Sequence, residues 1–502
     1  MKNNLHSRKT MKLTFSFAKN LIFFFLLCAQ VFSQSRSAES VIQKESLINT
    51  VSILASQDFD GRLPGSEGYN NAAKFAAEKF KELNLLPLGD SLFYQFLYVE
   101  YNRIDTPAVF SAIIDSVTIE YELGKDFVIR GFSGANRFSL PVVFCGYGIS
   151  RPDLGYDDYK DVNVKDKIVM VFKQNPIWKI DNKEWGNAYP REKSLIAKSK
   201  GAKGILFVSL PNDSKPQPLI GSVMHGEGEH PVDFPQLHIS IKAADDLLSM
   251  AALTISECQT KIDETKKPHS FLINTKANVI VNAHYEKNAR TMNVVALLEG
   301  SDPVMKNEYI VIGAHLDHVG SQAGLIFPGA NDNASGSAGV LEIAKAFALD
   351  KVKPKRSIIF VLFSAEEQGL FGSKHFVENM KIPKEKIVAM LNLDCIGYGD
   401  SIQVGNGKSS PKLWQIAKEI DSKHFNLMIN DTWSGGGADA TAFHEKGIPS
   451  LYFVSKYSYD HLHLPTDTVE TLNPDLFEKI VRLAFLTAKQ IADGKYEREI
   501  VR

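Results

Sequence analysis

Two adjacent carboxylates, Glu366 and Glu367, follow the apolar run of residues 357–363. A run of this length and composition predicts a buried parallel strand. Open α/β sheets bind their ligands beyond the carboxyl ends of the strands. Adjacent side chains in a turning segment diverge, so one carboxylate can hold a metal ion while its neighbour faces a water molecule on that ion. The pair alone is weak evidence, because Glu-Glu pairs are common on solvated surfaces.

Further acids and histidines close other apolar segments of the same region. Residues 309–314 run into His315 and Asp317, and residues 387–393 end in Asp394. Asp332 lies in a loop with glycines on both sides, and His463 lies in a histidine-rich segment. A charged residue that closes a buried strand is costly unless it is paired or bound to a metal. The pattern therefore predicts that these side chains meet at one edge of a sheet.

This group of side chains predicts a metal centre. Imidazole and carboxylate ligands without thiolate suit zinc, with manganese or cobalt as alternatives. Five such ligands exceed the need of one tetrahedral zinc and fit two ions that share a bridging carboxylate. Asp332 is the natural bridge, because its neighbouring glycines let the backbone come close. The sequence has no His-Glu-x-x-His, which argues against a helix-borne site with a single zinc.

The elements that must position these residues follow a regular order after residue 290. Strands are predicted at 293–299, 309–314, 357–363 and 387–394, and helices at 335–350 and 372–379. A last helix opens with Asn473 as its N-cap and Pro474 at its first position. This alternation predicts an α/β fold, a mostly parallel mixed sheet with helices on both faces. Helices are also expected at 46–56 and 69–85, and short strands between about 105 and 285.

The ordered set of motifs resembles the co-catalytic zinc aminopeptidases of metallopeptidase family twenty-eight. The motifs are His315-x-Asp317, Asp332-Asn333, Glu366-Glu367, Asp394 and His463-x-x-x-Asp467. Residues 60–65 and 447–449 also match the family's pattern, whereas the alanines around Asp439 depart from its usual Ser-Asp-His. Residues 166–169 and 201–204 resemble a protease-associated (PA) domain. The resemblance covers nearly all of the chain after residue 33.

The resemblance implies a role for each site residue. One Zn²⁺ takes His315 and Asp394, the other takes Glu367 and His463, and Asp332 bridges them, which makes two Zn²⁺ per chain. Asp317 would accept a hydrogen bond from the far nitrogen of His315 and so orient it. Glu366 would be the general base. The resemblance also implies a cis peptide bond between Asp332 and Asn333.

The implied organisation is a zinc exopeptidase fold with an inserted β-rich PA-like domain. Residues 1–33 are interpreted as a signal peptide, 34–104 and 286–502 as the peptidase domain, and 105–285 as the insert. The implied activity removes N-terminal residues from peptides that have a free N-terminus. A glutamate-type carboxypeptidase, a glutaminyl cyclase or, more remotely, a non-catalytic binding protein are the alternatives on this fold.

Several other histidines could compete with the chosen ones. We prefer His463 to His461 because it has the family's spacing to Asp467. His318 is interpreted as a solvated loop residue, with a substrate contact as the alternative. His225, His230 and His238 gather in the insert, and we interpret them as loop residues, with a second metal site as the alternative.

Composition and the first residues narrow the function classes further. The net charge of −1 gives no bulk attraction for nucleic acid. A basic segment, the apolar run 21–29 and Ser33 form a secretory signal pattern that is too short for a membrane span. We therefore expect export to the periplasm or the extracellular space, with no stable membrane span after cleavage. Lipidation of Cys28 is the alternative, although the bulky Leu27 before it argues against this.

The remaining expectations concern the cysteines and the oligomeric state. Cys145, Cys258 and Cys395 remain after cleavage, and an odd, widely spaced set does not form a disulfide framework. The oligomeric state stays open.

Overall fold

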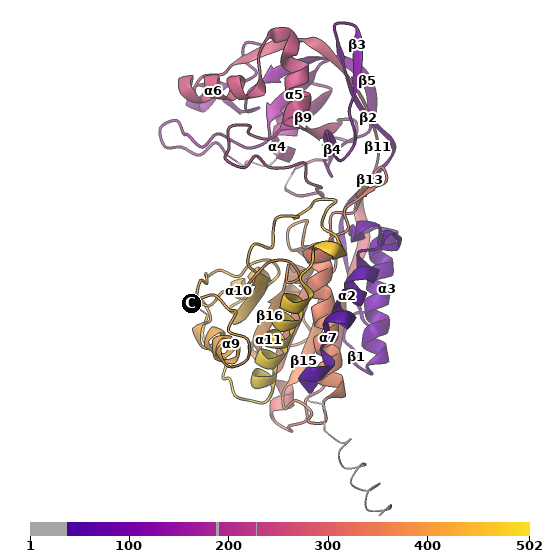
Figure 1. Ribbon diagram of the computed structural model, residues 1–502, viewed down its shortest axis with the longest axis vertical. Coiled ribbons are helices and arrows are strands. Elements are labelled where there is room, and N and C mark those ends of the chain that lie inside the picture. The colour runs from indigo at the N-terminus through magenta and orange to yellow at the C-terminus, as the bar shows by residue number, and fades with distance from the viewer. Residues whose placement is uncertain (1–37, 187–189, 227, 502) are drawn as a thin grey trace, which may run out of the picture.

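The computed structural model describes residues 38–186, 190–226 and 228–501. Two lobes lie one above the other, and a pair of long strands joins them (Figure 1). The predicted signal peptide and Cys28 lie outside the described residues. Within the described part of the chain, helices long and apolar enough to cross a membrane are absent.

The joining strands are β2 (Tyr94–Ile114) and β11 (Ser270–Leu298), which pair antiparallel from Tyr94 with Val294 up to Ile113 with Lys276. The expectation of only short strands in this part of the sequence is therefore wrong. The predicted strand at 293–299 is the last part of β11. Polar residues are frequent along β11, and two irregularities interrupt its register with β2. These features hide the continuity of the strand from a reading of apolar runs.

The lower lobe contains the mixed sheet that the sequence predicts. The strands β18 (Ser450–Ser455), β16 (Ile387–Leu393), β12 (Tyr309–His315) and β15 (Ser357–Phe363) lie side by side and parallel. At the two sides, β17 (Ile402–Gly405) and the lower part of β11 pair antiparallel with this set. The predicted strands at 309–314, 357–363 and 387–394 are thereby confirmed within one residue at each end.

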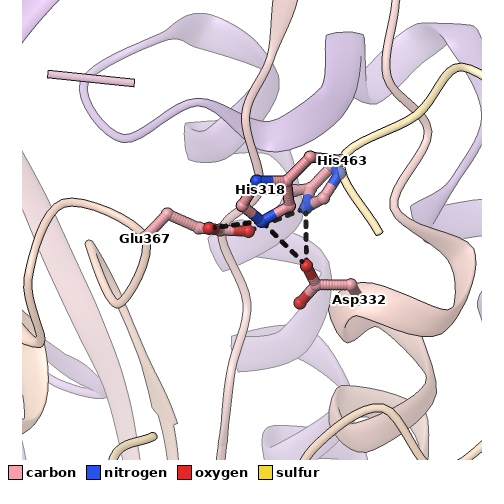
Figure 2. A group of neighbouring side chains, drawn as sticks. All are labelled: His318, Asp332, Glu367 and His463. Atoms are coloured by element: carbon pink, nitrogen blue, oxygen red, sulfur yellow. Dashed lines mark hydrogen bonds and ion pairs between the residues drawn. The ribbon is translucent and has the colours of Figure 1, made fainter. Parts of the chain in front are cut away.

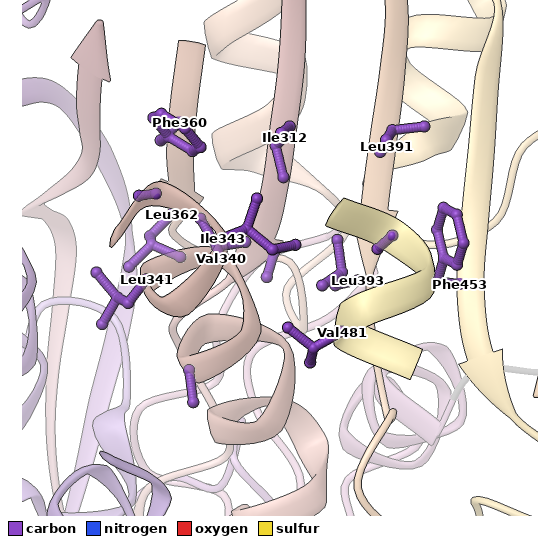
Figure 3. Packing of buried hydrophobic residues seen from close by; sticks show 14 of the residues in the cluster. Ile312, Val340, Leu341, Ile343, Phe360, Leu362, Leu391, Leu393, Phe453 and Val481 are labelled. Atoms are coloured by element: carbon purple, nitrogen blue, oxygen red, sulfur yellow. The ribbon is translucent and has the colours of Figure 1, made fainter. Parts of the chain in front are cut away.

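Helices cover both faces of this sheet, as predicted. On one face, Ile312, Phe360 and Leu391 pack against α7 (Gly336–Leu349) and α11 (Pro474–Ala492) (Figure 3). The alternate residues of the same strands belong to a second core with Phe376 of α8 (Phe371–Glu378) and Phe443 of α10 (Ala440–Glu445). Strand side chains alternate between the two faces, so continuous apolar runs such as 357–363 serve both cores.

The remaining helices of the lower lobe lie on the α7 face. They are α2 (Lys44–Leu54), α3 (Glu67–Glu82) and α9 (Pro411–His424). The predicted start of the last helix is confirmed, because the side chain of Asn473 accepts a hydrogen bond from the backbone N–H of Leu476 at 3.2 Å and Pro474 is the first residue of α11.

The upper lobe has its own part of the sheet and its own cores. Next to β11 come β5 (Asn136–Cys145), β8 (Ile168–Phe172), β9 (Gly204–Val208), β10 (Gln236–Ile239) and β4 (Phe127–Ile129). The strands β5, β8, β9 and β10 are parallel, and β4 pairs antiparallel with β10. One face packs on α5 (Ile241–Leu248) and α6 (Ile255–Thr265), and the other on α4 (Pro190–Ser199).

A small apolar cluster connects the lobes next to the joining strands. It combines Val128 and Val223 of the upper lobe with Val319 and Phe327 of the lower lobe. Nearby, the backbone N–H of Gly221 donates a 2.8 Å hydrogen bond to the carbonyl oxygen of His463. The three cysteines of the described chain are free and buried, as expected.

Candidate metal centre

Each sequence-predicted ligand lies at the same edge of the lower sheet. His315 is the last residue of β12, Glu367 lies four residues beyond the end of β15, and Asp394 directly follows β16. Because these strands are parallel and adjacent, their carboxyl ends meet at one edge. Asp332 lies in the turn Ala330–Ser335 before α7, and His463 comes from the segment after β18.

The first group of donors is His315, Asp332 and Asp394. The Nε2 of His315 lies 3.3 Å from Oδ1 of Asp332 and 3.4 Å from Oδ1 of Asp394. All three side chains are buried. Among the described residues, Oδ1 of Asp394 has no hydrogen-bond partner although it is buried. A buried carboxylate oxygen without a protein donor is costly, so a cation is the partner that it lacks.

The second group shares Asp332 with the first. The Nε2 of His463 lies 2.9 Å from Oε2 of Glu367 and 3.3 Å from Oδ2 of Asp332, as Figure 2 shows. Asp332 therefore turns Oδ1 toward the first group and Oδ2 toward the second. This is the arrangement that a bridging carboxylate requires.

The distances between the donor atoms suit zinc. Zinc–nitrogen and zinc–oxygen bonds of about 2.0–2.2 Å in a tetrahedron place neighbouring ligand atoms roughly 3.3 Å apart. The separations in the two groups run from 2.9 to 3.4 Å. The sequence-predicted ligands supply three donors to each group, the number that catalytic zinc sites use.

His318 belongs to the second group, and its interpretation as a solvated loop residue is wrong. The side chain is fully buried. Its Nδ1 lies 3.0 Å from Oε1 of Glu367 and 3.6 Å from Oδ2 of Asp332. The position directly after the His315-x-Asp317 motif was the only signal in the sequence, and a motif at a strand end does not tell which way the next side chain turns.

Asp467 holds the loop that carries the bridging aspartate. Its two carboxylate oxygens accept hydrogen bonds from the backbone N–H groups of Asn331 at 2.8 Å and Asp332 at 3.0 Å. The expected cis peptide bond between Asp332 and Asn333 is present. The spacing from His463 to Asp467 thus links one candidate ligand to the backbone of another.

Asp317 does not make the predicted hydrogen bond to His315. Its Oδ1 lies 3.8 Å from the Nδ1 of His315, whereas the backbone carbonyl oxygen of Asp317 lies 3.2 Å from that nitrogen. The carboxylate instead accepts hydrogen bonds from the backbone N–H groups of Glu366 at 3.2 Å and Glu367 at 3.3 Å. Asp317 therefore orients the turn with the two glutamates, and its own backbone orients His315.

Arg62 is a positioning residue that the sequence analysis did not single out. Its guanidinium group is fully buried and donates to the carbonyl oxygens of Leu54, Leu316, Pro328 and Gly329 at 2.7–2.8 Å. These bonds tie the loop after β12 to the loop before Asp332. The match of residues 60–65 to the family's pattern was the signal that could have found it.

Glu366 lies beside the two groups without belonging to either. Burial raises the pKa of Glu366 well above its ordinary value, and the charges of Glu367, Asp439 and Asp394 act in the same direction, while His315 opposes them. Burial also raises the pKa of Asp332, but the hydrogen bonds from His315 and His463 outweigh it, so the pKa of Asp332 lies well below its ordinary value. Glu366, the predicted proton acceptor, thus lies next to Asp332, whose carboxylate stays charged.

His461 and Asp439 stay outside the two donor groups. The Nδ1 of His461 lies 2.9 Å from Oγ1 of Thr466 in an exposed contact, so the choice of His463 agrees with the geometry. Asp439 is fully buried, and burial raises its pKa to about 7.

Comparison with known proteins assigns the lower lobe to a family. Residues 293–488 match the family described as Peptidase family M28. The chain contains a peptidase M28 domain. This match includes every predicted ligand and Glu366.

Relatives and solved structures agree with the M28 domain. A probable leucine aminopeptidase of Arthroderma benhamiae is 29% identical over 199 residues, which are 38% of this chain and 56% of that protein. The chain spans about half the length of the curated relatives that it matches. A peptidase M28 precursor of Shewanella amazonensis SB2B is similar with a TM-score of 0.64 at 21% identity, over 93% of this chain and 99% of that one.

A second structure, BSAP, a zinc aminopeptidase of Bacillus subtilis, is similar with a TM-score of 0.62 at 18% identity, over 91% of this chain and 98% of that one. Likeness at such identity shows the fold. It confirms the predicted α/β class, and it extends beyond the M28 domain into the upper lobe, because the alignment covers most of the chain.

Proposed function

We propose that the chain is a two-zinc metallo-aminopeptidase that removes N-terminal residues from peptides. The observation that carries the proposal is the pair of three-donor groups that share the two oxygens of Asp332. One zinc would be held by His315, Asp394 and Asp332, the other by His463, Glu367 and Asp332. His318 is a further donor beside the second ion. The similarity to a probable leucine aminopeptidase and to the zinc aminopeptidase BSAP supports the same activity.

The reaction follows from the residues around the two groups. Bound zinc polarises the scissile carbonyl and lowers the pKa of a water molecule. Glu366 takes the proton of the attacking water on a carboxylate oxygen and passes it to the leaving amine. The positive charge of bound zinc would lower the pKa of Glu366, so that its carboxylate is free to accept the proton. Asp317 holds the backbone of Glu366 in place, and the carboxylates around the ions attract the free amino group of the substrate.

The proposal also covers the domain organisation, the location of the protein and its partners. We interpret residues 105–285 as a PA-like insert between the two parts of the peptidase domain, 34–104 and 286–502. We further propose that residues 1–33 direct export to the periplasm or the extracellular space. Peptides are the expected partners, and nucleic acid is not.

The test combines metal analysis with substrates. We expect about two zinc ions per chain and hydrolysis of aminoacyl p-nitroanilides, because two donor groups are present and the free amine is required. The matched N-acetylated substrates should not be cleaved. One zinc per chain with cyclisation of N-terminal glutamine, or equal cleavage of the blocked substrates, would contradict the proposal.

A further inference from the structure

A cavity of about 660 Å³ lies between the lobes. The upper lobe lines it with residues 122–125, 216–219 and 238–241 and with Ser209, and the lower lobe with Leu325 and residues 464–466. Most of the wall is apolar, including Leu219, Leu325 and Leu464. Residues 464–466 directly follow His463 in the chain.

The pairing of the upper strands brings four polar side chains to one face of the sheet near this cavity. His238 of β10 pairs with Phe207 of β9 and with Val128 of β4. Residues that pair across neighbouring strands, and residues two positions further along, point to the same face. The backbone hydrogen bonds of Lys173 to Val208 and of Arg130 to Gln236 continue this pairing beyond the strand ends. The side chains on this face are Arg130, Lys173, Ser209 and His238.

These side chains are buried and contact one another through the cavity lining. The Nε2 of His238 lies 2.9 Å from Oγ of Ser209, and the Nζ of Lys173 donates a 2.6 Å hydrogen bond to Oε1 of Gln217. Ser209, Gln217 and His238 all line the cavity. His238 is 0% exposed, Arg130 6% and Lys173 7%.

The cations of this group lack a counter-charge. Within the described part of the chain, neither Arg130 nor Lys173 forms a salt bridge with a carboxylate. Arg130 Nε and Nη1 and His238 Nδ1 are buried without a hydrogen-bond partner among those residues. At the rim, Glu122 is exposed and pairs with the exposed Lys125 at 3.2 Å. Arg130 lies over the Phe132 ring, 5.4 Å from its centroid, and Lys173 donates to Gln217, but neither contact carries a negative charge, so an anion from outside the chain is the missing counter-charge.

The pKa values of Lys173 and His238 agree with the lack of a counter-charge. Burial lowers the pKa of Lys173 to about 6, and the charge of Arg130 acts in the same direction. Burial lowers the pKa of His238 well below its ordinary value, and Lys173 and Arg130 lower it further. Carboxylates near these groups would have had the opposite effect.

We propose that this cavity binds a small organic carboxylate with an apolar body. Arg130, and Lys173 when it takes up a proton, supply the positive charge behind the lining, the Gln217 amide in the lining offers N–H donors, and the apolar wall takes the hydrocarbon. The ligand is either a free acid or the carboxyl end of a short peptide. The proposal does not rest on the peptidase activity, because its residues lie outside the metal centre.

The test compares a carboxylate with its neutral amide on the metal-loaded full chain. In calorimetric titrations, 4-methylpentanoate should bind and 4-methylpentanamide should bind at least about tenfold more weakly, because hydrogen bonds to charged groups are the strong ones. Equal affinities, or no binding of the carboxylate, would overturn the proposal. N-acetyl-alanyl-leucine and its carboxyl-terminal amide form the second pair of probes. Preference for this peptide acid over the free acid would assign the peptide source, and the reverse would assign the free acid.

Variants separate this site from the metal centre, which could also attract a carboxylate. Lys173→Met and Arg130→Met should each weaken 4-methylpentanoate about tenfold or more. Lys203→Met removes the same charge from an exposed lysine of the upper lobe that does not line the cavity, and it should leave the affinity unchanged. Two variants are used in case one fails to fold, and thermal melting checks both. Wild-type affinity in folded Lys173→Met and Arg130→Met would overturn the proposal.

Discussion

Two buried groups of charged side chains, one in each lobe, differ in how their charges are balanced. In the lower lobe, Asp332, Glu367 and Asp394 lie 2.9–3.4 Å from histidine nitrogens, and their negative charges are unbalanced when the imidazoles are neutral, the form that binds a metal. In the upper lobe, Lys173 and Arg130 face each other's charge without a carboxylate. Buried charge that the protein does not balance points to a partner from outside. The comparison therefore assigns cations to the lower group and an anion to the upper one.

The largest effect should come from the residue that both halves of the lower group share. Asp332→Asn keeps the shape of the side chain and removes its charge. We expect kcat/KM to fall by at least about 10⁴-fold, because Lewis-acid polarisation and water activation both need the ions. Metal analysis should show less than the wild-type zinc content. Asp153→Asn, an exposed acid of the upper lobe, is the matched control. Wild-type zinc content and activity in Asp332→Asn would show that Asp332 does not bridge two ions.

A smaller loss is expected for the proton acceptor. Glu366→Gln should lower kcat by about 10³-fold, since general-base catalysis contributes roughly 10²–10⁴-fold. The zinc content should not change, because Glu366 is not among the donor groups. Single-turnover assays with metal analysis of the same samples check both statements. Glu378→Gln, on the surface beside Lys446, serves as the control. Undiminished turnover would exclude Glu366 as the base.

Support for the lower group can be tested through stability. Arg62→Met leaves four buried carbonyl oxygens without their donor, and we expect a loss of about 3 kcal/mol in the free energy of unfolding. Arg103→Met removes an exposed arginine and should change little. Urea denaturation of both variants measures the difference. A loss no larger than that of the control would show that Arg62 does not hold the loops.

The smallest effect concerns the upper group and depends on pH. The pKa of Lys173 is about 6 in the folded protein and near its ordinary value in the unfolded chain. Between these values the unfolded state binds more protons, so wild-type stability rises with pH. In anion-free buffer, the stability of the wild type relative to Lys173→Met should therefore rise by roughly 2.5 kcal/mol from pH 7 to pH 9.

Denaturation of both proteins at several pH values measures this difference, with Lys203→Met, at an exposed lysine outside the cavity, as the control that should show none. A relative stability that falls with pH would mean that Lys173 is stabilised in its charged form by a partner inside the protein. The charged side chains of the upper lobe would then be balanced inside the protein, and the comparison with the lower lobe would no longer assign an anion to them.

Local patterns in the sequence predicted much of the lower lobe. The apolar run 357–363 predicted β15, and the Asn473–Pro474 start predicted the beginning of α11. The structure also brings His315, Asp332 and His463 together, as predicted from strand ends and motifs. The predicted hydrogen bond between the Asp317 carboxylate and His315 was wrong. Such a bond depends on differences of less than an ångström, which the spacing of residues along the chain does not determine.

Other features have no local signal. The length of β2 and β11 depends on pairing between segments far apart in sequence, and polar residues interrupt their apolar patterns. The burial of His318 depends on how its loop packs under Arg62 and Gly329. Arg130 and Lys173 directly follow β4 and β8, and His238 lies in β10, so only the sheet makes them neighbours.

The sequence by itself determined the α/β class, the order of its strands and helices and the side chains that could bind metal, because these follow from apolar periodicity and from charged residues placed after buried strands. Only the tertiary structure decided that two lobes share joining strands, that Asp332 turns one oxygen to each donor group, and that cations gather beside the cavity. Those features depend on the distances between residues remote in the chain and on the exclusion of water around them, which exist only once the sheet has formed.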